Sequence, residues 1–280
     1  MPRNIGPISR LPRLPTLPFL GVSAAAYFLI QSAWRRAHEL KWAKSYQAPI
    51  PVVSVGNIAI GGTGKTPFVM YLVERLLDQG LKPCVISRGY RGTYGTEYVV
   101  VSDGNSLARQ VDPRLVGDEP FLMANNLMNK APVIVGRDRI KCIKFVYENF
   151  NCDLAILDDG FQHLKLKRDI DIVLLSGRED YMFPLGILRE PISTLSRADI
   201  VVLDSSQEVI SKRLCDFLAC HEHYTFKSYA VALRNGDVSN SKNINDLKGV
   251  DVLLVSAIAN PGRFRKMVES LDWRIVNHLI

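Results

Sequence analysis

The 280-residue sequence lacks several features that mark particular classes of protein. It has no internal repeat, no low-complexity tract and no compositional sign of disorder. Its five cysteines form no CxxC pair, and their odd number suits reduced thiols in a cytosolic compartment. Cys215, Cys220, His221 and His223 are neighbours in the sequence, but their spacing matches no standard zinc site. With 47% hydrophobic residues, the chain is long enough for one large or two modest globular domains.

Acidic residues are almost missing from the N-terminal region. Residues 1–45 contain seven Lys and Arg residues against Glu39 alone, so they hold +6 of the total net charge of +7. This basic excess surrounds an apolar stretch, which favours an anionic membrane surface over nucleic acid as the partner. Nothing in the sequence indicates an obligate protein partner.

The apolar stretch consists of the 21 uncharged residues between Arg13 and Arg35. A helix beginning near Pro18 would have roughly 17 residues, the short limit for a bilayer span. Trp34 suits the headgroup region, where Arg35 would meet lipid phosphates. We interpret residues 1–45 as a membrane-associating segment, whether spanning or interfacial, with a buried core helix as the alternative. A cleaved signal peptide is disfavoured because the nucleotide loop that follows needs cytosolic ATP.

Beyond this segment, strand-like and helical patterns alternate. Continuous Val, Ile and Leu runs between amphipathic segments are typical of a mostly parallel sheet with helices on both faces. We therefore predict an α/β domain over residues 46–215 and a smaller α/β lobe over residues 216–280. In the first domain we expect strands at 51–55, 83–87, 98–101, 132–135, 153–157, 170–175 and 199–203, and helices at 66–79 and 138–150. In the lobe we expect strands at 229–233 and 250–256 and a helix from about residue 261.

A glycine-rich loop between the first strand and the first helix gives the strongest functional signal. Its residues are Gly61, Gly62, Thr63, Gly64, Lys65 and Thr66. Ala59 occupies the first glycine position of the G-x-x-x-x-G-K-[ST] pattern, but the remaining glycines still let the backbone fold around phosphate. Lys65 would reach the β- and γ-phosphates of a nucleotide, and the Thr66 hydroxyl would bind Mg²⁺. The loop predicts ATP and magnesium binding.

Two acidic elements accompany this loop. An apolar strand ends in Asp158 and Asp159, at the edge of the sheet where ligands bind in open α/β folds. We predict that these carboxylates complete the magnesium coordination. The run 117–120 (Gly-Asp-Glu-Pro) places Asp118 where it would accept the proton of an acceptor hydroxyl, although the same run is also a good helix start. The spacing alone leaves both interpretations open.

Loop arginines suit the neutralisation of a transferring phosphoryl group, although a single loop arginine is more often a solvated charge. The candidates are Arg88, Arg91, Arg137, Arg139 and Arg189. A GTPase is not supported, because the run 129–132 (Asn-Lys-Ala-Pro) lacks the aspartate of a guanine-binding N-K-x-D motif. A membrane-bound regulatory or partitioning ATPase remains the alternative, although Ile60 stands where the K-G-G-x-G-K-T loop of that class has its leading lysine.

Six ordered motifs together resemble the tetraacyldisaccharide 4′-kinase family from the basic N-terminus to the end of the chain. They are Gly56-Asn57 with Gly61 to Pro67, Ser87 to Tyr90, Gly117 to Pro120, Asp158 to His163, Pro184 to Glu190 and Asn260 to Phe264. The resemblance implies phosphorylation of the 4′-hydroxyl of a tetraacylated glucosamine disaccharide 1-phosphate, a lipid A precursor. It places the enzyme at the cytoplasmic face of the bacterial inner membrane.

The resemblance also assigns roles to residues. Lys65 and Thr66 would bind ATP and magnesium, Asp158 and Asp159 would form the acidic magnesium element, and Asp118 would be the base, with Glu119 beside it near the metal. In the family the base is assisted by a histidine of an Asp-His motif, expected shortly beyond residue 280. His278 does not lie in such a motif, and the role is not transferred to it. The apolar run 276–280 has no polar tail, so we expect the natural chain to continue.

Overall fold

A computed structural model describes most of the chain after residue 43. The described residues are 32, 33, 36 and 44–280, with gaps at 91, 109–110, 207–209, 229–231, 235–240, 245–248, 257 and 259–260. The predicted membrane-associating segment 1–45 therefore lies almost wholly outside the described residues. Within the part of the chain that is described, no helix is both long and apolar enough to cross a membrane.

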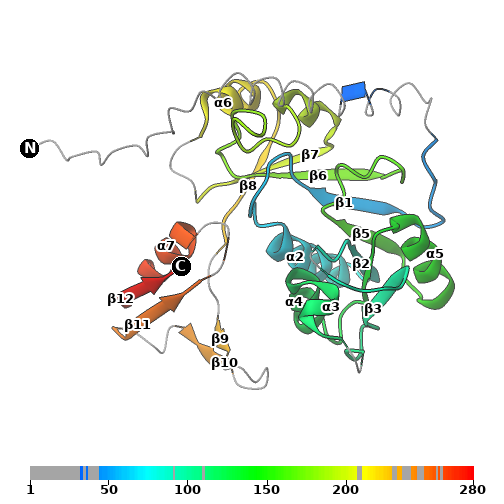
Figure 1. The fold of residues 1–280 in the computed structure, drawn as a ribbon, viewed down its shortest axis with the longest axis horizontal. Coiled ribbons are helices and arrows are strands. Elements are labelled where there is room, and N and C mark those ends of the chain that lie inside the picture. The colour runs from blue at the N-terminus through cyan, green and yellow to red at the C-terminus, as the bar shows by residue number, and fades with distance from the viewer. Residues whose placement is uncertain are drawn as a thin grey trace, which may run out of the picture.

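An eight-stranded sheet forms the larger domain (Figure 1). Its strands, in the order β3-β4-β2-β5-β1-β6-β7-β8, pair in parallel throughout except at β3, which is antiparallel to β4. This confirms the mostly parallel α/β sheet predicted from the sequence. The bounds are β1 Val52–Gly56, β2 Pro83–Ser87, β3 Tyr98–Ser102, β4 Val133–Gly136, β5 Leu154–Asp158, β6 Ile170–Leu175, β7 Ile200–Asp204 and β8 Tyr224–Phe226.

Helices cover both faces of this sheet because its central strands are apolar on both sides. Strands β1, β2 and β5 are buried along their whole lengths. Val69 and Val73 belong to the core on one face, whereas Ile143 and Val146 belong to the core on the other face. The helices are α2 Lys65–Asp78, α3 Pro113–Val116, α4 Asp118–Asn126, α5 Arg139–Asn149, a 3-10 helix at Ile192–Arg197 and α6 Lys212–Leu218.

A smaller lobe follows β8 and lies below the sheet in Figure 1. It contains the antiparallel pair β9 Ala232–Arg234 and β10 Ser241–Asn243. It also contains the parallel pair β11 Asp251–Val255 and β12 Arg274–Leu279, with helix α7 Pro261–Glu269 between them. The large sheet includes β8 and so extends past residue 215, the domain boundary predicted from the sequence.

Candidate active site

The glycine loop joins the buried centre of the sheet to a helix N-terminus. Strand β1 lies between β5 and β6, and the loop after it ends at Gly64, which adopts a left-handed conformation with φ 82° before α2 begins at Lys65. The loop is held from inside, because the Asn57 side-chain amide donates a 3.2 Å hydrogen bond to the buried Thr63 hydroxyl. Free amide groups at such a helix start, together with the helix dipole, form an anion-binding site.

Lys65 lies beside the acidic end of strand β5. Its ammonium is 3.5 Å from the Asp159 carboxylate, and its side chain is largely buried. Arg189 contacts the same carboxylate at 3.0 Å and also donates a hydrogen bond to the Asn57 side chain. Burial alone would raise the pKa of Asp159, but Lys65 and Arg189 outweigh burial and lower this pKa below its usual value. Asp159 therefore stays ionised and holds two cations at the mouth of the phosphate loop.

Asp158 occupies a different environment from its neighbour. It is buried at the end of β5, where one carboxylate oxygen accepts a 2.8 Å hydrogen bond from the Ser87 hydroxyl. The other oxygen, Oδ1, has no hydrogen-bond partner among the described residues. Burial, with a further contribution from the nearby Glu119 charge, raises the pKa of Asp158 to about 6. A cation bound between Asp158 and Glu119 would give the unpartnered Asp158 oxygen an electrostatic partner.

Helix α4 brings the third motif to the same place. The Thr66 hydroxyl lies 3.3 Å from a carboxylate oxygen of Glu119, in the first turn of α4. Asp118 is exposed as the first residue of this helix. A Cβ at Gly117, just before it, would lie 2.7 Å from the Tyr90 carbonyl, so the loop after β2 packs closely on the start of α4. The loops after β1, β2 and β5 therefore meet the start of α4.

The donor set fits a magnesium ion only in part as it stands. Thr66, Glu119 and Asp158 supply oxygen atoms, the ligands that Mg²⁺ prefers. Asp159, which the sequence also assigned to the metal, is engaged by Lys65 and Arg189 instead. Among the described residues, no group of three or more His, Cys, Asp or Glu side chains is already arranged around a common metal position.

This arrangement agrees with the comparison to known proteins. The model of the family LpxK, tetraacyldisaccharide-1-P 4'-kinase, matches residues 16–280. The chain belongs to this kinase family. The tetraacyldisaccharide 4'-kinase of Halothermothrix orenii is 34% identical over 281 residues, which cover 93% of this chain and 72% of that protein. The enzyme of the same name from Coxiella burnetii (strain CbuK_Q154) is 35% identical over 255 residues, which cover 90% of this chain and 70% of that protein.

A solved member of the family has the same fold. The crystal structure of the "apo" form of LpxK from Aquifex aeolicus in complex with ATP superposes with a TM-score of 0.73 at 32% sequence identity. The match covers 94% of this chain and 80% of that chain. The family resemblance inferred from the six motifs is therefore confirmed, as is the P-loop kinase fold.

Several residues of the kinase site were not predicted from the sequence. Ser87 and Asn57 lie in family motifs, but only the fold shows that they bind Asp158 and Thr63. Of the candidate arginines, Arg189 contacts Asp159, whereas Arg88 has an exposed side chain. Arg139 is buried and donates to the Gly136 carbonyl, and burial lowers its pKa. Arg91 lies outside the described residues.

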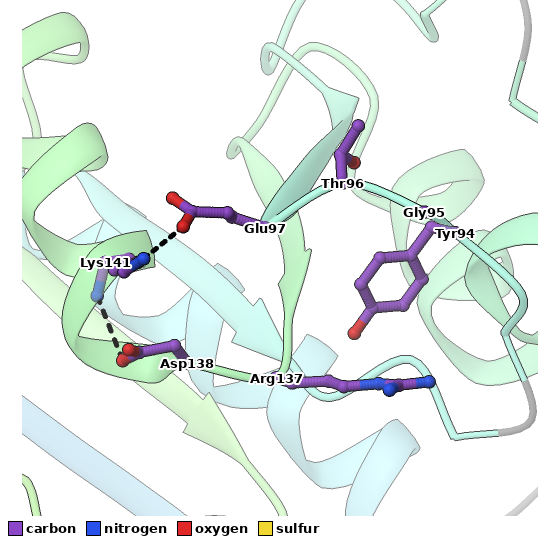
Figure 2. A pocket seen from close by; sticks show the side chains of 7 residues that line it. All are labelled: Tyr94, Gly95, Thr96, Glu97, Arg137, Asp138 and Lys141. Atoms are coloured by element: carbon purple, nitrogen blue, oxygen red, sulfur yellow. Dashed lines mark hydrogen bonds and ion pairs between the residues drawn. The ribbon is translucent and has the colours of Figure 1, made fainter.

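Arg137 lines a separate cavity of about 370 Å³ beyond strand β4 (Figure 2). The Arg137 guanidinium lies 5.9 Å from the centre of the Tyr94 ring, and Lys141 pairs with Glu97 on the other side of the cavity. None of the site residues predicted for nucleotide, metal or proton transfer lines this cavity.

The small lobe also reaches the phosphate loop. A Cβ at Gly64 would lie 3.5 Å from Nη1 of Arg263 in α7 of the lobe, and 3.0 Å from the Phe226 ring in β8 of the large sheet. His278 lies in β12, where its Nε2 is 2.8 Å from the Ser256 hydroxyl. That partner belongs to the lobe itself.

Proposed function

We propose that this chain transfers the γ-phosphate of ATP to the 4′-hydroxyl of a tetraacyldisaccharide 1-phosphate in lipid A biosynthesis. The observation that supports this most directly is the meeting of the Lys65 loop, the strand end at Asp158 and Asp159, and the start of helix α4, within a chain of the tetraacyldisaccharide 4'-kinase family. The Aquifex relative, which superposes on this fold, is described in complex with ATP. We assign ATP to the loop 61–66 on this basis.

The chain's own residues define the steps. The loop amides and Lys65 would hold the β- and γ-phosphates, which fixes the γ-phosphorus for in-line attack. Asp118, exposed at the start of α4, would orient the acceptor hydroxyl and accept its proton. Asp159 pairs with both Lys65 and Arg189. When Lys65 turns to the phosphates, Arg189 would still neutralise the charge of the Asp159 carboxylate.

Thr66, Glu119 and Asp158 are the residues that would hold Mg²⁺, with Asp159 as the further carboxylate assigned from the sequence. When bound, the ion neutralises charge on the β- and γ-phosphate oxygens. The orphaned oxygen of Asp158 and its raised pKa support this assignment, because a cation would favour the ionised form.

We place the enzyme at the cytoplasmic face of the bacterial inner membrane. The acceptor is a lipid that lies in a bilayer, and ATP is cytosolic. The basic, apolar residues 1–45 would associate with the anionic lipid surface and confine the enzyme to the plane of its acceptor. The regulatory ATPase considered as an alternative is not favoured, since the family matched over residues 16–280 is one of lipid kinases.

The test is transfer of label from [γ-³²P]ATP to tetraacyldisaccharide 1-phosphate dispersed in detergent with magnesium. Asp118→Asn is compared with Asp216→Asn, an exposed aspartate of helix α6. We expect labelled lipid from the unmodified chain and from Asp216→Asn, and a loss of at least about 100-fold in Asp118→Asn. Release of labelled phosphate to water without labelled lipid would instead identify an ATPase.

A further inference from the structure

Four large apolar side chains are exposed on two loops beside the phosphate site. Ile60 precedes the glycine loop, and Tyr181, Phe183 and Leu185 lie on the segment between β6 and the 3-10 helix. Each of the four is about half exposed, between 48% and 50% of its full surface. The two loops are joined directly, because the Ile60 amide donates a 2.7 Å hydrogen bond to the Ile187 carbonyl. We call these four side chains the apolar rim.

The rim is held on a defined backbone. The amides of Phe183 and Gly186 donate to the carbonyls of Leu188 and Met182 at 2.8 and 2.9 Å. The Leu188 amide donates in turn to the Tyr181 carbonyl at 2.9 Å, and the Leu188 side chain is buried in the core. This segment therefore presents Phe183 and Leu185 to solvent from a loop whose base is packed. Apolar side chains that are exposed together on a well-packed protein surface commonly mark a site of interaction with a protein or a membrane.

The charges around the rim indicate what it contacts. Three exposed cations lie on this segment and on the first turn of α6, namely Arg178, Lys212 and Arg213. The acidic residue among them is the partly exposed Asp180. The Arg213 guanidinium stacks 4.5 Å above the centre of the Tyr181 ring and lies 3.6 Å from Asp180. Aromatic and aliphatic side chains bordered by cations suit the interface of a bilayer that contains anionic lipid.

The apolar rim lies close to the phosphate site, so membrane contact there would place the site near a lipid acceptor. Leu185 is only four residues before Arg189, which binds Asp159 beside Lys65. An acceptor whose acyl chains stay in the bilayer exposes only its sugar and phosphate groups at the surface. A loop that seats beside the phosphate site on that surface would bring those groups within reach of the transferred phosphate.

We infer that the apolar rim is a membrane-docking surface that inserts between the headgroups of an anionic phospholipid bilayer, in addition to any binding by residues 1–45. The inference rests on the proposed function, which supplies a lipid acceptor. The docking itself needs neither ATP nor the acceptor, so it can be measured without turnover.

The test uses the full chain and vesicles of phosphatidylethanolamine and phosphatidylglycerol that contain no acceptor. The double variant Phe183→Ser/Leu185→Ser is compared with Leu122→Ser/Tyr147→Ser. The control removes two apolar side chains that are at least as exposed, from α4 and α5 on the other side of the domain from α6 (Figure 1). We expect the rim variant to bind vesicles about 10-fold more weakly and the control variant to bind as the unmodified chain does. Residues 1–45 are common to all three chains and do not affect the comparison.

Phe183→Trp provides a second readout that does not depend on loss of binding. We expect its fluorescence to shift to the blue on vesicles and to be quenched by brominated acyl chains. With detergent-dispersed acceptor, the rim variant should keep its kcat, whereas its KM for acceptor in vesicles should rise. Failure of lipid labelling by the unmodified chain would overturn the kinase proposal and leave the binding result standing.

Equal vesicle binding by the rim variant and the unmodified chain, with no shift or quenching at position 183, would overturn the inference. So would a self-associated chain that becomes monomeric in the rim variant, because the rim would then be a contact between copies.

Discussion

The guanidinium of Arg263 lies 2.9 Å from the carboxylate of Asp204 and so joins helix α7 of the small lobe to the end of β7 in the large sheet. Asp204 is buried, with 1% of its side chain exposed, and the Arg263 guanidinium also lies 6.0 Å from the centre of the Phe226 ring. Both Phe226 and Arg263 lie against Gly64. The lobe therefore contacts the phosphate loop directly through Arg263, beside the Phe226 ring of β8 in the large sheet.

Arg263→Ala should destabilise the protein by about 3 kcal/mol, because it leaves the charge of the buried Asp204 carboxylate without its paired cation. Arg265→Ala is the matched control on the same helix, since its ion pair with Glu269 is half exposed and contributes less than about 1 kcal/mol. Urea unfolding measures both values. We also expect Arg263→Ala to raise the KM for ATP. Equal stability losses in the two variants would show that the Asp204 pair does not hold the lobe.

Magnesium binding should weaken below pH 6. The pKa of Asp158 is raised to about 6 by burial and by Glu119. As pH falls through this value the carboxyl takes up a proton, which must be lost again before the group can bind a cation. For one such proton, the apparent magnesium affinity drops about 10-fold between pH 7 and pH 5. Magnesium titrations at fixed ATP concentration measure this. Asp158→Asn should bind magnesium weakly and with a shallower pH dependence than the unmodified chain. The protonation of ATP contributes equally to the pH dependence of both proteins. An unchanged slope in that variant would contradict the assignment.

His163 should make the fold sensitive to acid. Burial, with the Arg139 charge, lowers the pKa of His163 to about 4. In the unfolded chain the pKa is about 6.5, so the unfolded state binds more protons between these values and stability falls as pH decreases through this window. From pH 7 to pH 5 we expect a loss of about 2 kcal/mol that His163→Gln does not show.

The measurement is the free energy of unfolding in urea at each pH, expressed as the difference between the unmodified chain and the variant. This difference is needed because Asp158, with its raised pKa, has the opposite effect: its contribution is lost as pH rises through about 6. The exposed His223→Gln serves as control. If His223→Gln removed the acid sensitivity and His163→Gln did not, the assignment to His163 would be wrong.

Gly56→Ala should disrupt the site from within the core. A Cβ at Gly56 would lie 2.5 Å from the Cβ of Phe161 and 2.9 Å from its backbone nitrogen, which cannot move independently. We expect a cost of about 1–3 kcal/mol and weaker ATP binding, because β1 leads into the glycine loop. Gly95→Ala is the control, since no atom lies within 4 Å of its added Cβ. Thermal unfolding and ATP titration of both variants test this. Similar melting temperatures would contradict the close approach.

The local sequence determined the elements that follow from periodicity and from motif chemistry. The strands at β2 and β6 have the predicted bounds, and the other large-sheet strands predicted from the sequence differ from their predicted bounds by about one residue. Continuous Val, Ile and Leu runs specify strands buried on both faces, and Gly, Lys and Thr in fixed order specify a phosphate loop. The elements β8, α3, α6 and the 3-10 helix were not predicted, because none of them contains a continuous Val, Ile and Leu run and the helices are too short to show helical periodicity.

Only the tertiary structure decided how the site residues divide their roles. Asp158 and Asp159 are adjacent in sequence, yet one is buried against Ser87 with a raised pKa and the other holds Lys65 and Arg189 with a lowered pKa. Successive side chains at a strand end point in different directions, so their environments depend on β1, β2 and the loop before Arg189, none of which is near in sequence. The sequence determined which chemical groups are present, and the order of strands in the sheet decided which of them meet.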